Sequence, residues 1–318
     1  MRHIARAVLF CAVLLIIAQN ANADSAFNID VYKPEKAYSG TTIFPDNYTP
    51  AGPRVVEVDM KGNIVWEYRL PESLKRFTNP GFDVEPLPNG NILLVLPRKG
   101  VYEINPSGDT VWSYDDYKVS HDADRLPNGN TLVVFGNNDA MDDAQVKEIN
   151  PNGKIVWTWY AKNHFNREPF NKISNQGWTH ANAAVRLENG NTLVSLRNFH
   201  LVVEVDFRGT VVRRIGGKGM LKHQHDPEEL PDGNILLANH GSPQAAVVID
   251  PGKNEIIWKY AIEDSGAYPV RDANRLPNGN TLITSTTKII EVTQSGEVVW
   301  QLSLKGAKFT RRQGASMG

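Results

Sequence analysis

The residues of this chain that could do chemistry together are histidines at one recurring position. The 318-residue sequence contains eight histidines. Several of them precede copies of a short motif, Leu-Pro-Asn-Gly-Asn followed by apolar residues. Five residues before the Leu of each copy stand Phe82, His121, Asn182, His225 and Arg271. Seven residues before it stand Pro80, Val119, His180, His223 and Pro269. A neutral imidazole can serve as nucleophile, proton carrier or metal ligand, so these positions are candidates for one shared site.

Two alternating motifs build the frame around these residues. The first occurs at Leu87–Val95, Leu126–Val134, Leu187–Val194, Leu230–Leu237 and Leu276–Ile283. The second reads apolar-Glu-apolar-Asp/Asn, a Gly turn, then two apolar residues and usually Trp; its six copies start at Val56, Tyr102, Lys147, Val203, Val247 and Ile290. Asn-Gly between apolar runs is a strong hairpin signal, so each pair of motifs predicts four antiparallel strands. Six copies predict an all-β, six-bladed β-propeller.

The strands of one repeat fix where the histidines lie. Around Leu126 we expect strands at about 121–126, 130–135, 146–150 and 154–160. The innermost strand of a blade lines the central channel. The residues five and seven before the Leu should therefore meet at the end of the channel where these strands begin, which we call the top. Arg197 ends the second strand of the fourth blade, and Asn239 and His240 end that of the fifth. We therefore expect these residues at the same face.

The first and last repeats predict how the ring closes. The first blade has strands at Thr41–Phe44, Val55–Asp59 and Ile64–Tyr68 but no innermost strand. The tail Phe309–Gly318 follows the last repeat, and we expect it to supply that strand. The ring would then be closed by N- and C-terminal strands. Ala161–Thr179 is the longest insertion, and we expect it to form a loop over one face.

The N-terminus predicts export. Arg2 and Arg6 precede an apolar stretch, Ala7–Ala18, and an Ala21-Asn22-Ala23 cleavage site. This pattern is typical of a signal peptide, residues 1–23, removed to leave a single propeller domain at 24–318 without a membrane span. An uncleaved anchor is the alternative. We expect a periplasmic or secreted protein. The single cysteine, Cys11, lies in the signal, so the mature chain has no disulfide.

Charge and spacing limit the partners and cofactors. The chain has 34 Lys and Arg against 35 Asp and Glu and no basic run, which argues against nucleic-acid binding. Three imidazoles could ligate zinc, but no pair has a tight spacing on one element, although His223 and His225 form an alternate-residue pair. We predict no metal and no cofactor. Four aspartates should point to the opposite face of the innermost strands from the histidines. We expect them to bond backbone groups or neighbouring blades; they are Asp83, Asp122, Asp226 and Asp272.

At these motifs the chain resembles the bacterial arylsulfate sulfotransferases, a family of exported six-bladed propellers. Trp178-Thr-His180-Ala-Asn182 with the downstream Ser195-Leu-Arg197 is similar to one family segment, and Gln224-His225-Asp226 and Ser120-His121-Asp122 are similar to two others. The resemblance implies transfer of a sulfuryl group from an aryl sulfate to a phenol through a sulfohistidine at His225. His180, Arg197 and His121 would hold the sulfuryl oxygens. Substrate-binding roles are expected for Asn182, Asn239, His223 and Trp178.

Other readings of the same residues stay open. Either His223 or His225 could be the nucleophile, and we choose His225. Trp178, Phe199 and Phe165 could flank an aryl group or pack in the core. The channel histidines could instead be metal ligands of a hydrolase or lyase, or the propeller could be a non-catalytic binding module. Well-studied members of the family carry an extra N-terminal β-domain and a disulfide, which this chain lacks.

Overall fold

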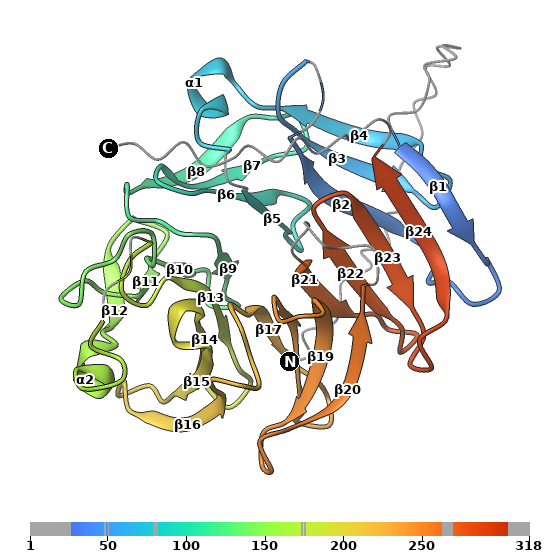
Figure 1. Cartoon of the computed structure of the whole chain (residues 1–318). Helices are drawn as coiled ribbons and strands as arrows, with labels where there is room; N and C mark the ends of the chain where they lie inside the picture. Colours follow the sequence, from blue (N-terminus) through green and yellow to red (C-terminus); the bar gives the residue numbers. More distant parts are fainter. Residues whose placement is uncertain are drawn as a thin grey trace, which may run out of the picture.

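The chain folds as a six-bladed β-propeller (Figure 1). The computed structural model describes residues 27–47, 49, 51–78, 82–172, 174, 176–262 and 270–304. The predicted signal peptide, the tail Phe309–Gly318, Pro80 and Pro269 lie outside these residues. In Figure 1 the six sheets follow one another in chain order around a common centre.

The strands are antiparallel, and in blades two to five the innermost strand comes first in its blade. Blade one has β2 (Thr41–Asp46), β3 (Arg54–Asp59) and β4 (Ile64–Arg69). Blade two has β5 (Asp83–Pro86), β6 (Ile92–Leu96), β7 (Gly100–Ile104) and β8 (Thr110–Asp115). Blade three has β9 (Ala123–Arg125), β10 (Thr131–Val134), β11 (Val146–Ile149) and β12 (Ile155–Trp159).

Blades four to six continue the pattern. Blade four has β13 (Ala181–Arg186), β14 (Thr192–Leu196), β15 (Leu201–Val205) and β16 (Val211–Gly216). Blade five has β17 (His225–Glu229), β18 (Ile235–Asn239), β19 (Ala245–Asp250) and β20 (Glu255–Ala261). Blade six has β21 (Val270–Arg275), β22 (Thr281–Ser285), β23 (Lys288–Val292), β24 (Val298–Leu304) and, outermost, β1 (Phe27–Tyr32). The short helices are α1 (Glu72–Lys75), α2 (Lys162–Phe165) and the 3₁₀ turn η1 (Arg197–Phe199).

The repeated tryptophans fasten each blade to the next except blade four, where Arg213 stands at this position. Trp66 Nε1 donates to the carbonyl of Pro106 in blade two, and Trp112 Nε1 donates to that of Pro151 in blade three, both at 3.0 Å. Trp300 Nε1 donates to Met60 O at 3.0 Å and so joins blade six to blade one. This series therefore links neighbouring blades through specific hydrogen bonds.

The ring closes through the N-terminal strand. β1 pairs with β24, from Phe27 opposite Leu304 to Tyr32 opposite Trp300. It adds a fifth, outer strand to blade six, which the repeat pattern does not predict. Among the described residues blade one has three strands, and the expectation that Phe309–Gly318 supplies a fourth lies outside them.

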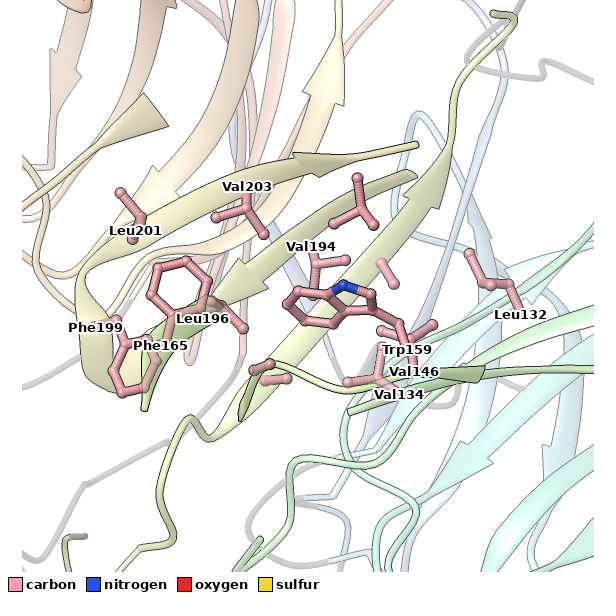
Figure 2. Close-up of a cluster of buried hydrophobic side chains, with 14 of the residues drawn as sticks. Leu132, Val134, Val146, Trp159, Phe165, Val194, Leu196, Phe199, Leu201 and Val203 are labelled. Atoms are coloured by element: carbon pink, nitrogen blue, oxygen red, sulfur yellow. The ribbon is translucent and has the colours of Figure 1, made fainter. Parts of the chain in front are cut away.

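The apolar core lies between neighbouring blades, and its largest cluster also carries the insertion. Figure 2 shows the indole of Trp159 between blades three and four, with Val134 and Val146 on one side and Val194 on the other. Phe165 and Trp178, near the two ends of the insertion Ala161–Thr179, belong to the same cluster. The insertion is thus anchored to the top of these blades by buried aromatic rings. None of the helices in the described part of the chain is long and apolar enough to cross a bilayer.

Candidate active site

A central cavity of about 270 Å³ receives residues from all six blades. Its lining includes the whole set that stands five residues before the motif Leu: Phe82, His121, Asn182, His225 and Arg271. The repeat count therefore placed these five residues at one level correctly. His180 and His223, two residues earlier, do not line this cavity but lie beside it.

Irregularities in three inner strands determine what faces the cavity. The pairing of β13 with β14 shifts between Ala181 and Ala183, that of β17 with β18 after His225, and that of β21 with β22 between Val270 and Asp272. A bulge adds a residue to one strand and breaks the alternation of side chains. Asn182, Asp226 and Arg271 lie at these bulges, and all three line the cavity.

The aspartate side chains lie on a different face of the strands from the one that alternation along a regular strand predicts. Four aspartates also line the cavity: bulges bring Asp226 and Asp272 to it, whereas Asp83 begins the regularly paired strand β5 and Asp122 directly precedes β9. Asp122 does bond a neighbouring blade as expected, since its Oδ2 accepts from Ala184 N at 2.7 Å. Burial raises the pKa of Asp83 to about 7 and that of Asp226 well above its usual range, and charge repulsion among these carboxyls adds to the rise. The carboxyls that line this part of the channel are therefore harder to ionise than exposed carboxyls.

Six histidines form three close pairs at the top of the channel. The ring centroids are 4.6 Å apart for His225 and His240, 5.0 Å for His200 and His223, and 5.6 Å for His121 and His180. Within the described residues, no group of three histidine, cysteine, aspartate or glutamate side chains is arranged to hold a metal ion. The prediction that no metal is bound remains a prediction.

His225 has the properties of a nitrogen nucleophile. Its side chain is buried, and its Nε2 has no hydrogen-bond partner among the described residues. Burial first, then the charges of His240 and Arg271, hold the pKa of His225 well below its usual value. The imidazole is therefore neutral at physiological pH.

His180 is held in one tautomer and one position. Its Nδ1 lies 2.8 Å from the carbonyl of Gln176, which can only accept, so Nδ1 carries the proton and Nε2 has the lone pair in the neutral ring. The backbone at His180 has φ of 47°, an uncommon value for a residue with a side chain. Burial lowers the pKa of His180, and the hydrogen bond to Gln176 opposes this effect.

Asp139, in the loop between β10 and β11, holds the backbone that leads into His180. Its Oδ1 accepts from His180 N at 3.0 Å, and its Oδ2 accepts from the Thr179 hydroxyl at 2.6 Å. Its backbone carbonyl accepts from Trp178 N at 2.8 Å. Asp139 is 1% exposed, so this network is shielded from water. No repeat motif contains Asp139, so the sequence pattern did not predict this role.

Two arginines supply positive charge to the histidines. Arg197 begins η1, directly after β14, and its Nη1 donates to Gln176 Oε1 at 2.9 Å. Arg271 lines the cavity, and its charge contributes to lowering the pKa of His121, which burial and the neighbouring His180 bring to about 3. The predicted site omitted Arg271 and His240. Arg271 stands at the same offset from its motif as His121 and His225, and that offset was the signal that could have included it.

Asn182 connects the segment Trp178–Asn182 to the segment Gln224–Asp226. Its Nδ2 donates to the carbonyl of Gln224 at 2.8 Å, which fixes the orientation of the amide. Its Oδ1 is buried in the cavity wall without a partner in the described part of the chain. The Ser195 hydroxyl, from the expected Ser-x-Arg segment, also donates to Gln224 O at 3.2 Å. These contacts set the position of the residue directly before His225.

Three expected substrate-binding residues lie elsewhere. Trp178 is fully buried, and its ring packs against Phe199 at 5.4 Å between centroids, so it is a core residue that does not face the cavity. Asn239 accepts from Lys222 N at 2.8 Å through Oδ1 and therefore fixes a loop. His223 pairs with His200, whose Nδ1 accepts from His223 N at 3.2 Å. The aromatic neighbours Phe165 and Phe199 are buried in the same cluster as Trp178.

A propeller whose central cavity is lined by neutral histidines and Arg271, with the charge of Arg197 nearby, has the elements of an anion-binding site. Residues 28–222 match the model of the arylsulfotransferase (ASST) family, and the chain belongs to that family. The matched region includes His121, His180, Asn182 and Arg197 but ends before His223 and His225. No curated protein matches the chain.

Solved structures resemble the chain in fold. A protein of unknown function from Bacteroides caccae has a TM-score of 0.58 and 19% identity over 83% of this chain and 93% of its own. Virginiamycin B lyase from Staphylococcus aureus has a TM-score of 0.55 and 12% identity over 88% and 85%. The WD40 β-propeller domain of Doa1 has a TM-score of 0.51 and 14% identity over 86% and 77%. At these identities the likeness concerns the fold.

Proposed function

We propose that this protein is an exported aryl-sulfate sulfotransferase that works through a sulfohistidine at His225. The observation that carries the proposal is the buried, unpartnered Nε2 of His225, among the described residues, in a cavity that Arg271, His121 and Asn182 also line. Membership of the arylsulfotransferase family supports the same chemistry. The donor is a phenolic sulfate ester and the acceptor is a phenol.

The first half-reaction transfers the sulfuryl group to the enzyme. The Nε2 lone pair of His225 attacks sulfur, an N–S bond forms, and the S–O bond to the aryl group breaks. The aryl oxygen leaves with the bonding electron pair. Negative charge on the sulfuryl oxygens is stabilised by the guanidinium groups of Arg197 and Arg271 and by His180 and His121. The Nδ1 proton of His225 passes to the leaving phenolate, so that the modified ring becomes neutral and the first product departs as a phenol; the proton that His180 later takes from the acceptor replaces it when the N–S bond breaks.

The second half-reaction needs a base for the acceptor. The Nε2 lone pair of His180 is available because Nδ1 is held by Gln176 O. It takes the proton of the acceptor phenol, whose oxygen then attacks sulfur and breaks the N–S bond. Asn182 Oδ1 can accept a hydrogen bond from the acceptor hydroxyl before that transfer. An anionic donor offsets the arginine charges, so binding raises the low pKa values of the histidines toward those needed for proton exchange.

A chromogenic aryl sulfate tests the proposal on protein treated with a chelator. Release of the phenol should depend on a phenolic acceptor, and His225→Ala should lower the rate roughly a thousandfold or more. His164→Ala is the matched control, because His164 contacts Gly209 O away from the cavity. Incubation with donor alone should add one sulfuryl group to the peptide that contains His225. Turnover that appears only with added metal, or that survives in His225→Ala, would rule the mechanism out.

Export is part of the proposal and is supported by the signal-like pattern of residues 1–23. Mass spectrometry of protein recovered from the cell envelope should find a mature N-terminus near Asp24. Recovery of the full-length chain from the cytoplasm would contradict it.

A further inference from the structure

A second, larger cavity of about 870 Å³ lies between blades four and five. One wall is the segment after β16, residues 218–222. The other comprises the loop Gly241–Pro243 and residues Asn254–Ile256 and Lys259 at and beside the start of β20. His200 and Asn239 complete it. We call this the interblade groove. Its volume lies in the range of small-molecule sites.

The interblade groove is basic and partly apolar. Lys218, Lys222 and Lys259 line it, all three are exposed, and none forms an ion pair with a described residue. Glu255 is the single acidic residue of the lining. The apolar part of the wall consists of Met220, Leu221, Pro243 and Ile256. Such a lining suits an organic anion, since the ring or chain contacts apolar surface while the acid meets ammonium groups.

Backbone hydrogen bonds hold the lysine-bearing segment in place. Gly217 N donates to His200 O at 2.8 Å, and Leu221 N donates to Gly217 O at 3.0 Å. Lys222 N donates to Asn239 Oδ1 at 2.8 Å, while Lys222 O accepts from His240 N at 3.0 Å. The segment is therefore fixed to both blades, which preorganises the position of Lys222.

The inner end of the interblade groove borders the histidine cluster. His200 lines the groove, and its ring lies 5.0 Å from that of His223. The charges of Lys222 and Lys218 contribute to lowering the pKa of His200, after burial and Arg197. Asn239 lines the groove and is followed by His240, which stacks on His225. This adjacency would let a substrate that reacts at His225 direct a substituent toward the lysines.

We propose that the interblade groove binds an acidic substituent of the aryl substrate, so that the preferred acceptors are phenols carrying a carboxylate beyond the ring. This substrate class rests on the sulfotransferase function proposed above. The reaction centre handles the sulfuryl group, and the groove recognises the second negative charge. Neutral phenols remain weaker acceptors.

Matched acceptors test the substrate class. With one aryl sulfate donor, phenols bearing a carboxylate on alkyl chains of increasing length are compared with the corresponding primary amides. We expect the best carboxylate to have a KM about tenfold below that of its amide, and this difference to shrink as salt is added. In Lys218→Gln/Lys222→Gln, the ratio of the two KM values should approach one. Lys61→Gln/Lys154→Gln makes the same charge change on blades one and three and should keep the ratio.

A binding measurement separates this inference from the proposed reaction. Fluorescent pyrenetetrasulfonate should bind the full chain, with a Kd raised about two- to fivefold by each lysine substitution. The control double variant should bind like the wild type. If the lysine variant loses pyrenetetrasulfonate binding but the wild type shows no sulfotransferase activity, the groove proposal stands and the proposed reaction is wrong. Equal KM values for acid and amide in an active enzyme, or equal pyrenetetrasulfonate binding by wild type and lysine variant, would overturn the groove proposal.

Discussion

The arginines around the cavity, together with burial, determine the protonation of the neighbouring histidines. The site holds two guanidinium groups and neutral imidazoles, because positive charge and burial both disfavour a second proton on each ring. His240 illustrates the balance: burial and Arg271 lower its pKa to about 3, although its Nε2 donates to Val270 O at 2.7 Å. In the proposed reaction a neutral histidine attacks sulfur, so the arginines would bind the anion and also keep the nucleophile available.

Replacing Arg271 should separate these two contributions. Arg271→Gln removes a positive charge, so the pKa values of His121, His225 and His240 rise. The acid limb of kcat/KM against pH should move to higher pH, since neutral His225 forms only above its raised pKa. At pH 8 we expect kcat/KM to fall about 10- to 100-fold because one sulfuryl contact is lost. Arg271→Lys should restore much of the pH profile. An acid limb that does not move in Arg271→Gln would contradict the electrostatic role.

At the scale of elements, the sequence repeats predicted the strands of each blade but not the bulges in the innermost strands. The strands expected at about 121–126 and 130–135 are β9 (Ala123–Arg125) and β10 (Thr131–Val134). The turns encode these hairpins locally, through Gly129 at φ of 85°. The bulge at Asn182 depends on contacts with other blades, such as its hydrogen bond to Gln224 O. Parity counted along a regular strand therefore found the histidine level and the structural bonding of the aspartates, but did not show that the aspartates also line the cavity.

The loop before β13 offers a test at this scale. A Cβ on Gly177 would lie 2.5 Å from Asp139 Oδ1, and Gly177 has φ of 104°. Gly177→Ala should therefore displace Asp139 and the His180 backbone that it holds. We expect kcat to fall at least tenfold at temperatures where the variant is folded, with a lower Tm.

Gly153→Ala provides the matched control for that loop. Gly153 has φ of 78°, but a Cβ added there would meet no atom of the described residues within 4 Å. It should show the conformational cost of roughly 1 kcal/mol alone, with kcat unchanged. Equal loss of kcat in the two variants at matched folded fraction would show that Asp139 does not position His180.

For the whole molecule, the sequence predicted the number of blades and a ring closed by N- and C-terminal strands, but not which N-terminal segment joins blade six. Six copies of the second motif gave six blades, because each copy carries its own turn. The tryptophan bond from Trp300 Nε1 to Met60 O and the pairing of β1 with β24 close the ring between residues far apart in sequence. Phe27–Tyr32 is short and has no turn signal of its own, so nothing local marked it as the outermost strand of blade six.

The channel as a whole predicts an unusual dependence of stability on pH. His121 and His240, with pKa values of about 3, contribute stability that is present above the unfolded value near 6.5 and is lost as pH falls toward 3. Asp83 and Glu228, with pKa values raised to about 7, contribute stability that is present below about 4 and is lost as pH rises through 7. Between about pH 4 and 6.5 the two effects oppose each other, so the free energy of unfolding should change little there and fall on either side.

Asp83→Asn tests the contribution of a channel carboxyl to the pH dependence of the free energy of unfolding. The amide has no proton to lose, so the variant should gain stability relative to the wild type as pH rises from 4 to 8. Because Asp83 is partly exposed in the cavity wall, we expect a gain of roughly 2 kcal/mol, about half of what the full pKa shift would give. Asp109→Asn, on the exposed turn before β8, removes the same charge outside the channel and should give no such trend. Urea unfolding at pH 4, 6 and 8 measures the difference, and parallel curves for wild type and Asp83→Asn would show that the channel carboxyls ionise without cost to the fold.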